Sequence, residues 1–465
     1  MRILSNLVIC GLLVLVTACT KEKVAEVFLP VDTHTTYAAA IQKLHLDNTT
    51  AGRQWLAAAD LVFERPVPVA LPFQEEYFFD AAQPQALAYE FTVPRGLLLR
   101  IDIESEFNAY FLDVFRVETG SGNRGFTPVA TKPQTATRLE FTPRIQGRYL
   151  VRVQPELLEE GRLLLTITGQ ASLTWPVQDS TPDDIISYFG QARDGGARVH
   201  HGLDIKAPRG TLTLAAIAAT GRPGLNERGG NVVRLFNTDL DVMLYYAHLD
   251  TQLINRNTPV QPGDTLGTVG TTGNARGGTP HLHIGVYDGS WRTPADPWYF
   301  FVPPGNNLPP LPAIPEQRWV TVSCQVQLLQ YPAAVSGLRK SPARVDYRGD
   351  KLDPAFISSF AVQAHHDTEQ VLQPGVPVRI TGSRSGYHLI TLPAGRQGYI
   401  AAADLQPLSS RPVVLKQGLV LYKVPETTAA TVGRLAAGSV VEILAQYTGS
   451  TLLQYGNQMY WAHLM

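Results

Sequence analysis

The sequence is poor in cysteine and carries almost no net charge. It holds three cysteines in 465 residues, and 39 Lys and Arg against 40 Asp and Glu leave a formal net charge of −1. A chain without surplus positive charge has no general attraction for the phosphates of nucleic acid, so we expect no nucleic-acid partner. Charged residues make up only 17% of the chain and hydrophobic residues 44%, which excludes a disordered or coiled-coil protein.

The length and the turn-forming residues indicate the fold class. The chain is about three times as long as a typical domain, so we expect two to four domains. Its 39 Gly and 34 Pro are scattered along the sequence, which favours short strands and turns over long helices. We therefore predict a mostly β protein.

The first residues have the features of an export signal. Arg2 precedes a short apolar run over residues 7–16, and the small residues Thr17 and Ala18 stand directly before Cys19. This arrangement resembles a bacterial lipobox, which implies a lipoprotein signal over residues 1–19 and a membrane anchor through an acylated Cys19. The alternative is a plain secretory signal whose cleavage site contains a cysteine. Both interpretations predict an exported chain.

The expected export leaves one cysteine for the folded protein. Cys10 would leave with the signal and Cys19 would carry lipid, so only Cys324 remains and no intramolecular disulfide is expected. Because Cys324 ends an apolar stretch, we predict a buried structural thiol rather than a nucleophile.

Two regions precede the chemistry-bearing part of the chain. Residues 20–65 are predicted to form a short helical segment, in which the apolar spacing fits two helices broken near Asp47 and Asn48. Residues 66–175 contain apolar and polar residues in alternation, around residues 89–93, 97–103, 149–153 and 163–167. Alternation is typical of strands with one buried face, so we predict a β-sandwich with a spacer or binding role.

The C-terminal part contains a proline-rich stretch and an internal repeat. Residues 303–317 are predicted to be a semi-rigid linker. Beyond it, residues 318–407 and 411–465 share an early L-x-x-x-P, a glycine turn before an alternating strand and a closing aromatic strand. The pattern resembles bacterial SH3-like domains, with an insertion in the first copy around residues 345–370. The resemblance implies two SH3-like barrels that bind wall peptides.

Histidines are concentrated in one short part of the chain. Five of the eleven fall between His200 and His283. On a strand, residues an even number apart share a face, so His200 and Asp204 would point to one side and His201 to the other. By the same rule His281 and His283 share a face. One pocket can therefore receive His200, Asp204, His281 and His283.

The residue types indicate the chemistry of that pocket. Two imidazoles and one carboxylate, with a fourth position left for water, are the ligand set of a hydrolytic zinc site. His248 ends another alternating segment and could stand beside the same metal. An imidazole that is not a ligand suits proton transfer from the water and stabilisation of a developing oxyanion.

The motifs together resemble the LytM/lysostaphin-type zinc endopeptidases of peptidoglycan. They occur in family order as H-x-x-x-D at residues 200–204, G-G-N-V-V at 229–233, Y-A-H-L at 246–249, P-G-D at 262–264, G-N-A-R-G-G-T-P at 273–280 and H-L-H at 281–283. For residues 181–302 the resemblance implies an antiparallel-sheet domain with one Zn²⁺ per chain. His200, Asp204 and His283 would be the zinc ligands, and His248 and His281 the catalytic pair. His201 creates a competing H-x-x-D pattern, against which strand parity favours His200.

The sequence thus predicts a zinc-dependent endopeptidase that hydrolyses peptidoglycan stem peptides or cross-bridges and faces the cell wall from a membrane anchor. One alternative is a non-catalytic protein of the same fold that binds the wall or activates an amidase. Another is a peptidase acting on proteins. The bond cleaved and the oligomeric state are left open.

Overall fold

A computed structural model describes residues 33–107, 109–119, 124–133, 136–289, 292–316, 318–335, 361–363, 365–425 and 429–464. Cys19 and the whole export signal lie outside these residues, so the lipid anchor remains a prediction. Within the described part, no helix combines the length and apolar character needed to cross a membrane. The fold is mostly antiparallel β, as predicted.

Two short helices begin the described chain, as the apolar spacing predicted. They are α2 (Thr33–Lys43) and α3 (Thr50–Glu64), separated by the 3₁₀ turn η1 (Leu46–Asn48). Thr49 caps α3 by accepting a hydrogen bond from the amide of Gly52 at 3.0 Å. The helices pack on the strands that follow, because Trp55 is buried and its indole N–H donates to the carbonyl of Pro155 at 2.8 Å.

Nine strands form a two-sheet unit over residues 67–171. They are β1 (Val67–Pro68), β2 (Phe73–Phe79), β3 (Leu87–Val93), β4 (Leu97–Ser105), β5 (Tyr110–Thr119), β6 (Arg124–Thr131), β7 (Arg138–Phe141), β8 (Gly147–Pro155) and β9 (Gly161–Ala171). One sheet has the order β1-β3-β8-β5-β6, and β2-β9-β4-β7 belong to the other. Residues of both sheets share one core, in which Leu99, Val151 and Ile167 are fully buried. Burial alternates along β4 and β9, as the sequence pattern predicted.

A ten-stranded sheet carries the clustered histidines. Its strands are β10 (Ile185–Ser187), β13 (Leu203–Lys206), β14 (Leu212–Leu214), β15 (Ala219–Asn226), β16 (Gly230–Asn237), β17 (Val242–Gln252), β18 (Thr258–Val260), β19 (Thr265–Val269), β20 (His281–Asp288) and β21 (Pro294–Ala295). The central order is β10-β13-β20-β17-β16-β15-β18. A separate hairpin of β11 (Ala192–Arg193) and β12 (Arg198–Val199) stands beside it, and α4 (Trp298–Phe301) packs into its core.

Two C-terminal modules follow. The first contains β22 (Trp319–Val322), β23 (Val326–Tyr331), β24 (Ala334–Val335), β25 (Ala361–Val362), β26 (His365–Leu372), β27 (Pro377–Arg384), β28 (Tyr387–Thr391), β29 (Gln397–Ala401) and β30 (Leu405–Pro407). The second contains β31 (Arg411–Val414), β32 (Leu419–Tyr422), β33 (Thr431–Leu435), β34 (Val440–Tyr447), β35 (Ser450–Tyr455) and β36 (Gln458–Ala462).

The two modules share one pattern of strand pairing. In the first, β23 pairs with β26 and β29, and β28 with β27 and β29; in the second, β32 pairs with β33 and β36, and β35 with β34 and β36. The equivalent turns contain Gly375 and Gly438, whose φ angles of 85° and 88° favour glycine. The repeated sequence register therefore corresponds to repeated topology.

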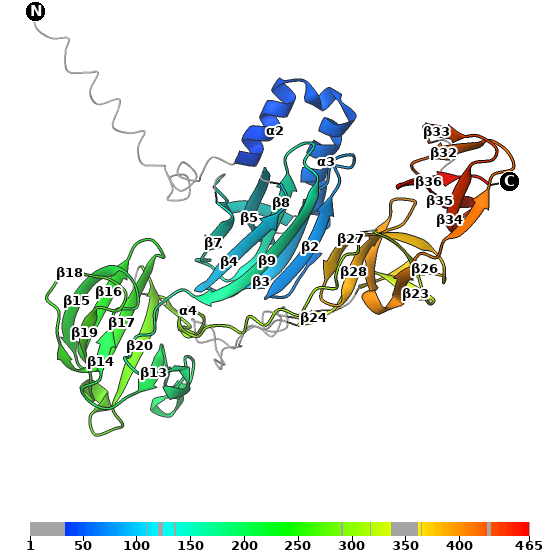
Figure 1. Ribbon diagram of the computed structural model, residues 1–465. Helices are drawn as coiled ribbons and strands as arrows, with labels where there is room; N and C mark the ends of the chain where they lie inside the picture. Colours follow the sequence, from blue (N-terminus) through cyan, green and yellow to red (C-terminus); the bar gives the residue numbers. More distant parts are fainter. Residues whose placement is uncertain are drawn as a thin grey trace, which may run out of the picture.

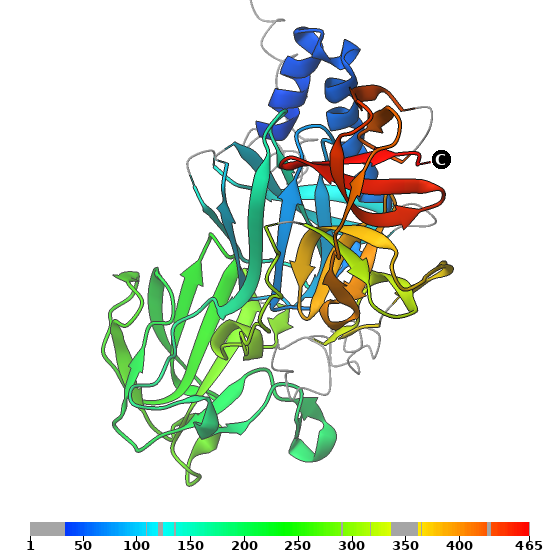
Figure 2. The same cartoon turned by 45° about the vertical axis from the view of Figure 1, so that its right-hand side comes forward.

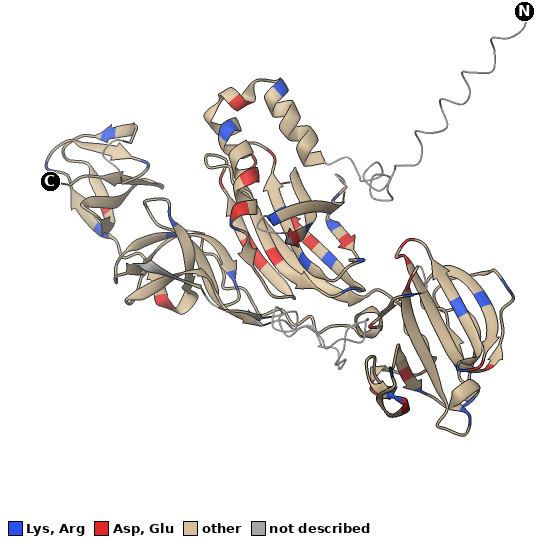
Figure 3. Ribbon diagram, turned by 180° about the vertical axis from the view of Figure 1, so that it is seen from behind, with Lys and Arg blue, Asp and Glu red and all other residues tan. Residues whose placement is uncertain are grey.

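The first module is joined to the two-sheet unit through its strands. β27 pairs with β2, with Tyr77 opposite Gly382, so one eleven-stranded sheet runs through both. The ten-stranded sheet and the C-terminal modules lie on opposite sides of the two-sheet unit (Figures 1 and 2). Figure 3 shows charges of both signs interspersed on the two-sheet unit, in keeping with the small net charge.

Cys324 differs from the expectation of a buried thiol. It is exposed between β22 and β23, and its thiol donates to Asp404 Oδ1 at 3.4 Å. The apolar stretch before it forms β22, in which Val322 is fully buried, but the chain leaves the core immediately afterwards.

Candidate metal centre

Two neighbouring strands place three of the candidate residues. β13 and β20 are antiparallel, with Asp204 directly opposite His283 and Lys206 opposite His281. Leu282 is fully buried in the core, whereas His281 and His283 line a groove on the other face. The shared face predicted for the two histidines of H-L-H is therefore confirmed.

His200 reaches the same point by a different route from the one predicted. Residues 200–202 lie between β12 and β13 and belong to no strand, so strand parity does not orient His200. Backbone hydrogen bonds hold it instead: its amide donates to Gln191 at 2.8 Å, and its carbonyl accepts from Gly190 at 2.8 Å. The expectation of a continuous strand from His200 to Asp204 was wrong, although the two side chains do converge.

The converging atoms form a compact donor set. His200 Nε2 lies 3.0 Å from Asp204 Oδ1 and 2.9 Å from His283 Nδ1, and His283 Nδ1 lies 2.9 Å from Asp204 Oδ1. Donor atoms around tetrahedral zinc are about 3.3 Å apart, so a small outward movement suits the metal. Burial raises the pKa of Asp204, but interactions with the two histidine rings at the centre outweigh burial and hold that pKa far below its usual range. This cluster could hold a metal ion.

Contacts behind the donors determine which atoms they present. His200 Nδ1 donates to the carbonyl of Tyr188 at 2.9 Å, so its Nε2 is left with a lone pair for the centre. Arg193 donates to Asp204 Oδ2 at 3.1 Å, which leaves Oδ1 facing the histidines. A Cβ at Gly202 would lie 2.6 Å from His283 Cε1, so only glycine leaves room for that ring.

A β-bulge directs His248 into the groove. Across β16 and β17, Asn231 is opposite Leu249 but Val233 is opposite Tyr246, so β17 holds one extra residue. His248 lies at this bulge with a φ of 65°. Tyr246 and Leu249 are both fully buried although they are an odd number of residues apart, because the bulge turns His248 out of the alternation.

His248 and His281 stand side by side near the donor set, with ring centroids 5.0 Å apart. Each donates its Nδ1 hydrogen to a carbonyl, His248 to Thr272 at 2.9 Å and His281 to Thr279 at 2.7 Å. The Nε2 atom of each neutral ring therefore carries a lone pair, and that of His281 lies 3.9 Å from Asp204 Oδ1. Burial, with a smaller effect of His283, lowers the pKa of His248 to about 4.

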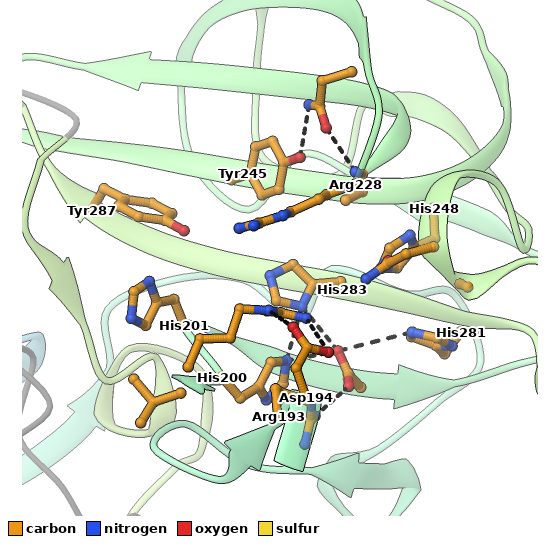
Figure 4. Close-up of a pocket in the computed structure, with 18 of the residues that line it drawn as sticks. Arg193, Asp194, His200, His201, Arg228, Tyr245, His248, His281, His283 and Tyr287 are labelled. Carbon is orange, nitrogen blue, oxygen red and sulfur yellow. Dashed lines mark hydrogen bonds and ion pairs between the residues drawn. The ribbon is translucent and has the colours of Figure 1, made fainter. Parts of the chain in front are cut away.

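The groove has a volume of about 770 Å³, and its lining residues all lie between Arg193 and Tyr287. Figure 4 shows His200, His248, His281 and His283 gathered around its centre. His201 lines the groove but is not part of the donor cluster found among the described residues; its ring stacks on Phe189 at 6.2 Å. The donor cluster therefore contains His200 of the H-x-x-x-D pattern, and not His201 of the competing H-x-x-D pattern.

Sequence reasoning missed the residues that support the centre. Arg193, on the separate hairpin, and the carbonyls of Tyr188 and Thr272 belong to no recognised motif. Their positions follow from loop packing, which has no periodic signal in the sequence.

The fold and the donor set define a β-sheet domain with an open groove and a cluster of side chains that could hold a metal ion. Residues 198–297 match the model of peptidase family M23, and this stretch contains the whole donor cluster together with His248 and His281. The predicted LytM/lysostaphin-type domain is thereby confirmed for this part of the chain.

Proteins of several activities contain similar sequences. The chain is 34% identical over 141 residues to the uncharacterized lipoprotein YgeR of Escherichia coli, covering 30% of this chain and 50% of the relative. It is 32% identical over 128 residues to the L-Ala–D-Glu endopeptidase of Bacillus subtilis, covering 26% and 39%. It is also 32% identical over 125 residues to the murein hydrolase activator NlpD of Escherichia coli, covering 26% and 29%.

The chain spans half or less of the length of each of these relatives. Among solved structures, the catalytic domain of lysostaphin from Staphylococcus simulans is 26% identical, with a TM-score of 0.22, and the match covers 24% of this chain and 88% of that domain. The M23 family thus includes both endopeptidases and activators of other hydrolases.

Proposed function

We propose that this chain is a zinc-dependent endopeptidase that hydrolyses peptide bonds in peptidoglycan stem peptides or cross-bridges. The observation that carries the proposal is the complete set of groups at one groove. His200, Asp204 and His283 converge within 4.8 Å, and two further imidazoles present bare Nε2 atoms beside them. A site that only bound peptide would need no such set.

Bound zinc would polarise the scissile carbonyl and lower the pKa of the attacking water. The chain's own residues divide the remaining tasks. His281 Nε2 is placed to accept a proton from the water, since its Nδ1 is committed to Thr279. His248, fixed through Thr272, faces the position of the developing oxyanion; burial keeps its ring neutral before the reaction, and the negative charge that develops there would favour its protonation and a hydrogen bond from Nε2.

The rest of the chain supports a wall-bound location. An acylated Cys19 would hold the protein at a membrane outside the cytoplasm, and a relative is named a lipoprotein. Two modules of repeated topology, proposed as SH3-like wall-binding domains, would keep the groove near its substrate. Tethering of this kind raises the effective concentration of the peptide.

A second candidate is an activator of another wall hydrolase, since the relative NlpD is named a murein hydrolase activator. An activator can use the groove without metal chemistry. Retention of the whole donor set favours the enzyme.

The test is digestion of purified sacculi by the chain beginning after Cys19, with and without a chelator. We expect chelator-sensitive release of fragments whose new amino terminus, read by mass spectrometry, identifies the bond. Resistance of both sacculi and isolated muropeptides to a zinc-loaded protein would contradict the enzyme and favour the activator. Stimulation of an added amidase by the same preparation would then support that second candidate.

A further inference from the structure

The groove around the metal centre is lined by more positive than negative side chains. Four arginines line it, against two aspartates, and one of these aspartates is the candidate ligand Asp204. The lining arginines are Arg193, Arg198, Arg228 and Arg234. The chain as a whole has a net charge of −1, so this surplus is local.

Three of these arginines have partners within the domain. Arg193 donates to Asp204, and Arg198 forms an ion pair with Asp194. The guanidinium of Arg234 lies over the ring of Tyr245, 5.6 Å from its centroid. Arg228 differs: it is exposed, no hydrogen bond or ion pair of its side chain is found among the described residues, and its one internal attraction is a weaker electrostatic one to Asp194, which is already paired with Arg198.

The backbone beneath Arg228 is held on both sides. Its own carbonyl accepts from the amide of Asn274 at 2.9 Å, and Gly229 donates to Asn226 Oδ1 at 2.7 Å. The carbonyl of Gly229 accepts from the amide of His248 at 2.7 Å. The Arg228 turn is therefore tied directly to a residue of the proposed catalytic pair.

The packing of Gly229 tightens the same turn. A Cβ there would lie 2.0 Å from the hydroxyl of Tyr245, and that hydroxyl accepts from Asn226 at 2.9 Å. Figure 4 shows the side chain of Arg228 extending over the groove between Tyr245 and His283. A cation on a fixed backbone that no internal hydrogen bond occupies is available to an anionic ligand in the groove.

We propose that Arg228 binds a carboxylate of the substrate beside the scissile bond, so that the groove selects an acidic stem peptide over an uncharged cross-bridge. A guanidinium can bind a carboxylate through two parallel hydrogen bonds, which gives orientation as well as affinity. This inference rests on the proposed function, because it names the substrate class of that same groove.

The test compares two synthetic substrates and two matched variants. The substrates are a cross-linked stem-peptide dimer and the same dimer with its free carboxylates converted to primary amides. Arg228→Gln removes the proposed contact. Arg222→Gln is the control, because Arg222 lies on β15 of the same sheet, is exposed, and donates to Asn257 rather than lining the groove. Bound zinc is measured for each protein.

For the carboxylate substrate, we expect Arg228→Gln to lower kcat/KM by about ten- to a hundred-fold, the effect of one charge-assisted contact. The amide substrate should be cleaved slowly and equally by both proteins, with zinc content unchanged. Arg222→Gln should resemble the wild type. Equal cleavage of the two substrates by the wild type, or an equal loss on both in Arg228→Gln, would overturn the inference.

Binding measurements separate this inference from the proposed function. If the wild-type protein cleaves neither dimer, the enzyme proposal fails. Calorimetry then measures the binding of the same dimers and tests whether Arg228 contacts a carboxylate. Carboxylate-dependent binding that Arg228→Gln weakens by about ten-fold or more supports the subsite. Binding that is the same for both dimers, or unchanged in the variant, overturns it.

Discussion

The chemistry available to each imidazole depends on what its far nitrogen contacts. His200, His248 and His281 each donate Nδ1 to a backbone carbonyl, which can only accept, so each neutral ring presents a bare Nε2 to the groove. His283 instead turns Nδ1 toward the centre, where the missing Cβ of Gly202 gives it room. Three of these four rings therefore present Nε2 to the groove, and the fourth presents Nδ1. Residue types alone could suggest a zinc site, but not which nitrogen of each ring serves it.

At the residue scale, metal binding and proton transfer should separate by mutation. His283→Ala should abolish cleavage of sacculi together with bound zinc, because it removes one of three donors. His281→Ala should lower activity by about a hundred- to ten-thousand-fold while zinc largely remains, because it removes only a proton acceptor. Metal content and cleavage are measured on the same samples. Full activity in His281→Ala would refute the role given to that residue.

At the scale of elements, the histidine side chains of the groove are oriented both by regular strands and by departures from them. Alternation correctly predicted that His281 and His283 share a face of β20. It could not predict the bulge in β17 that turns His248 into the groove, because a bulge depends on the cross-strand partner. Nor could it reveal that His200 is oriented by a loop. Such features are decided by long-range pairing rather than by local sequence.

A buried histidine in β28 allows a test at this scale. Burial lowers the pKa of His388, partly offset by a hydrogen bond to the carbonyl of Gly382. Between that lowered pKa and about 6.5, the unfolded chain binds the proton more readily, so this contribution to stability is lost as pH falls. One proton changes the unfolding free energy by at most about 1.4 kcal/mol per pH unit.

We therefore expect His388→Gln to flatten the acid-side decline of the melting temperature between pH 7 and pH 5. Calorimetry across that range measures it. His45→Gln is the matched control, because His45 is exposed in the turn before η1. An unchanged slope in His388→Gln would show that other groups account for the decline.

At the scale of the whole molecule, contacts between regions far apart in the sequence determine the arrangement. Besides the pairing of β2 with β27, the hydroxyl of Tyr399 in the first module donates to the buried Glu75 at 2.8 Å. The proline-rich linker is extended, but Asn306 exchanges hydrogen bonds with Gly169, and Ile314 is buried in the core of the first module. The linker is thus held at these two points rather than acting as a free spacer.

This packing predicts that the two-sheet unit and the first module unfold together. A Cβ at Gly382 would lie 2.9 Å from the carbonyl of Glu76 on β2, so Gly382→Val should push the paired strands apart. We expect calorimetry to show one shared transition splitting into two, with a loss of about 1–3 kcal/mol. Gly433→Val is the control, because a Cβ at Gly433 meets its nearest neighbour at an ordinary 3.8 Å. An unsplit, unshifted transition in Gly382→Val would contradict the coupling.

The sequence by itself determined the β-rich class, the two N-terminal helices, the repeated register of the C-terminal modules and the residues of the cluster that could hold a metal ion. All of these depend on local periodicity or on short motifs, which neighbouring residues encode directly. Only the tertiary structure decided the loop that carries His200, the bulge behind His248, the exposure of Cys324 and the sheet shared by β2 and β27. It also placed the exposed side chain of Arg228 over the groove. These features arise from contacts between segments that are far apart in the sequence. The free energies of such contacts cannot be read from a local sequence pattern.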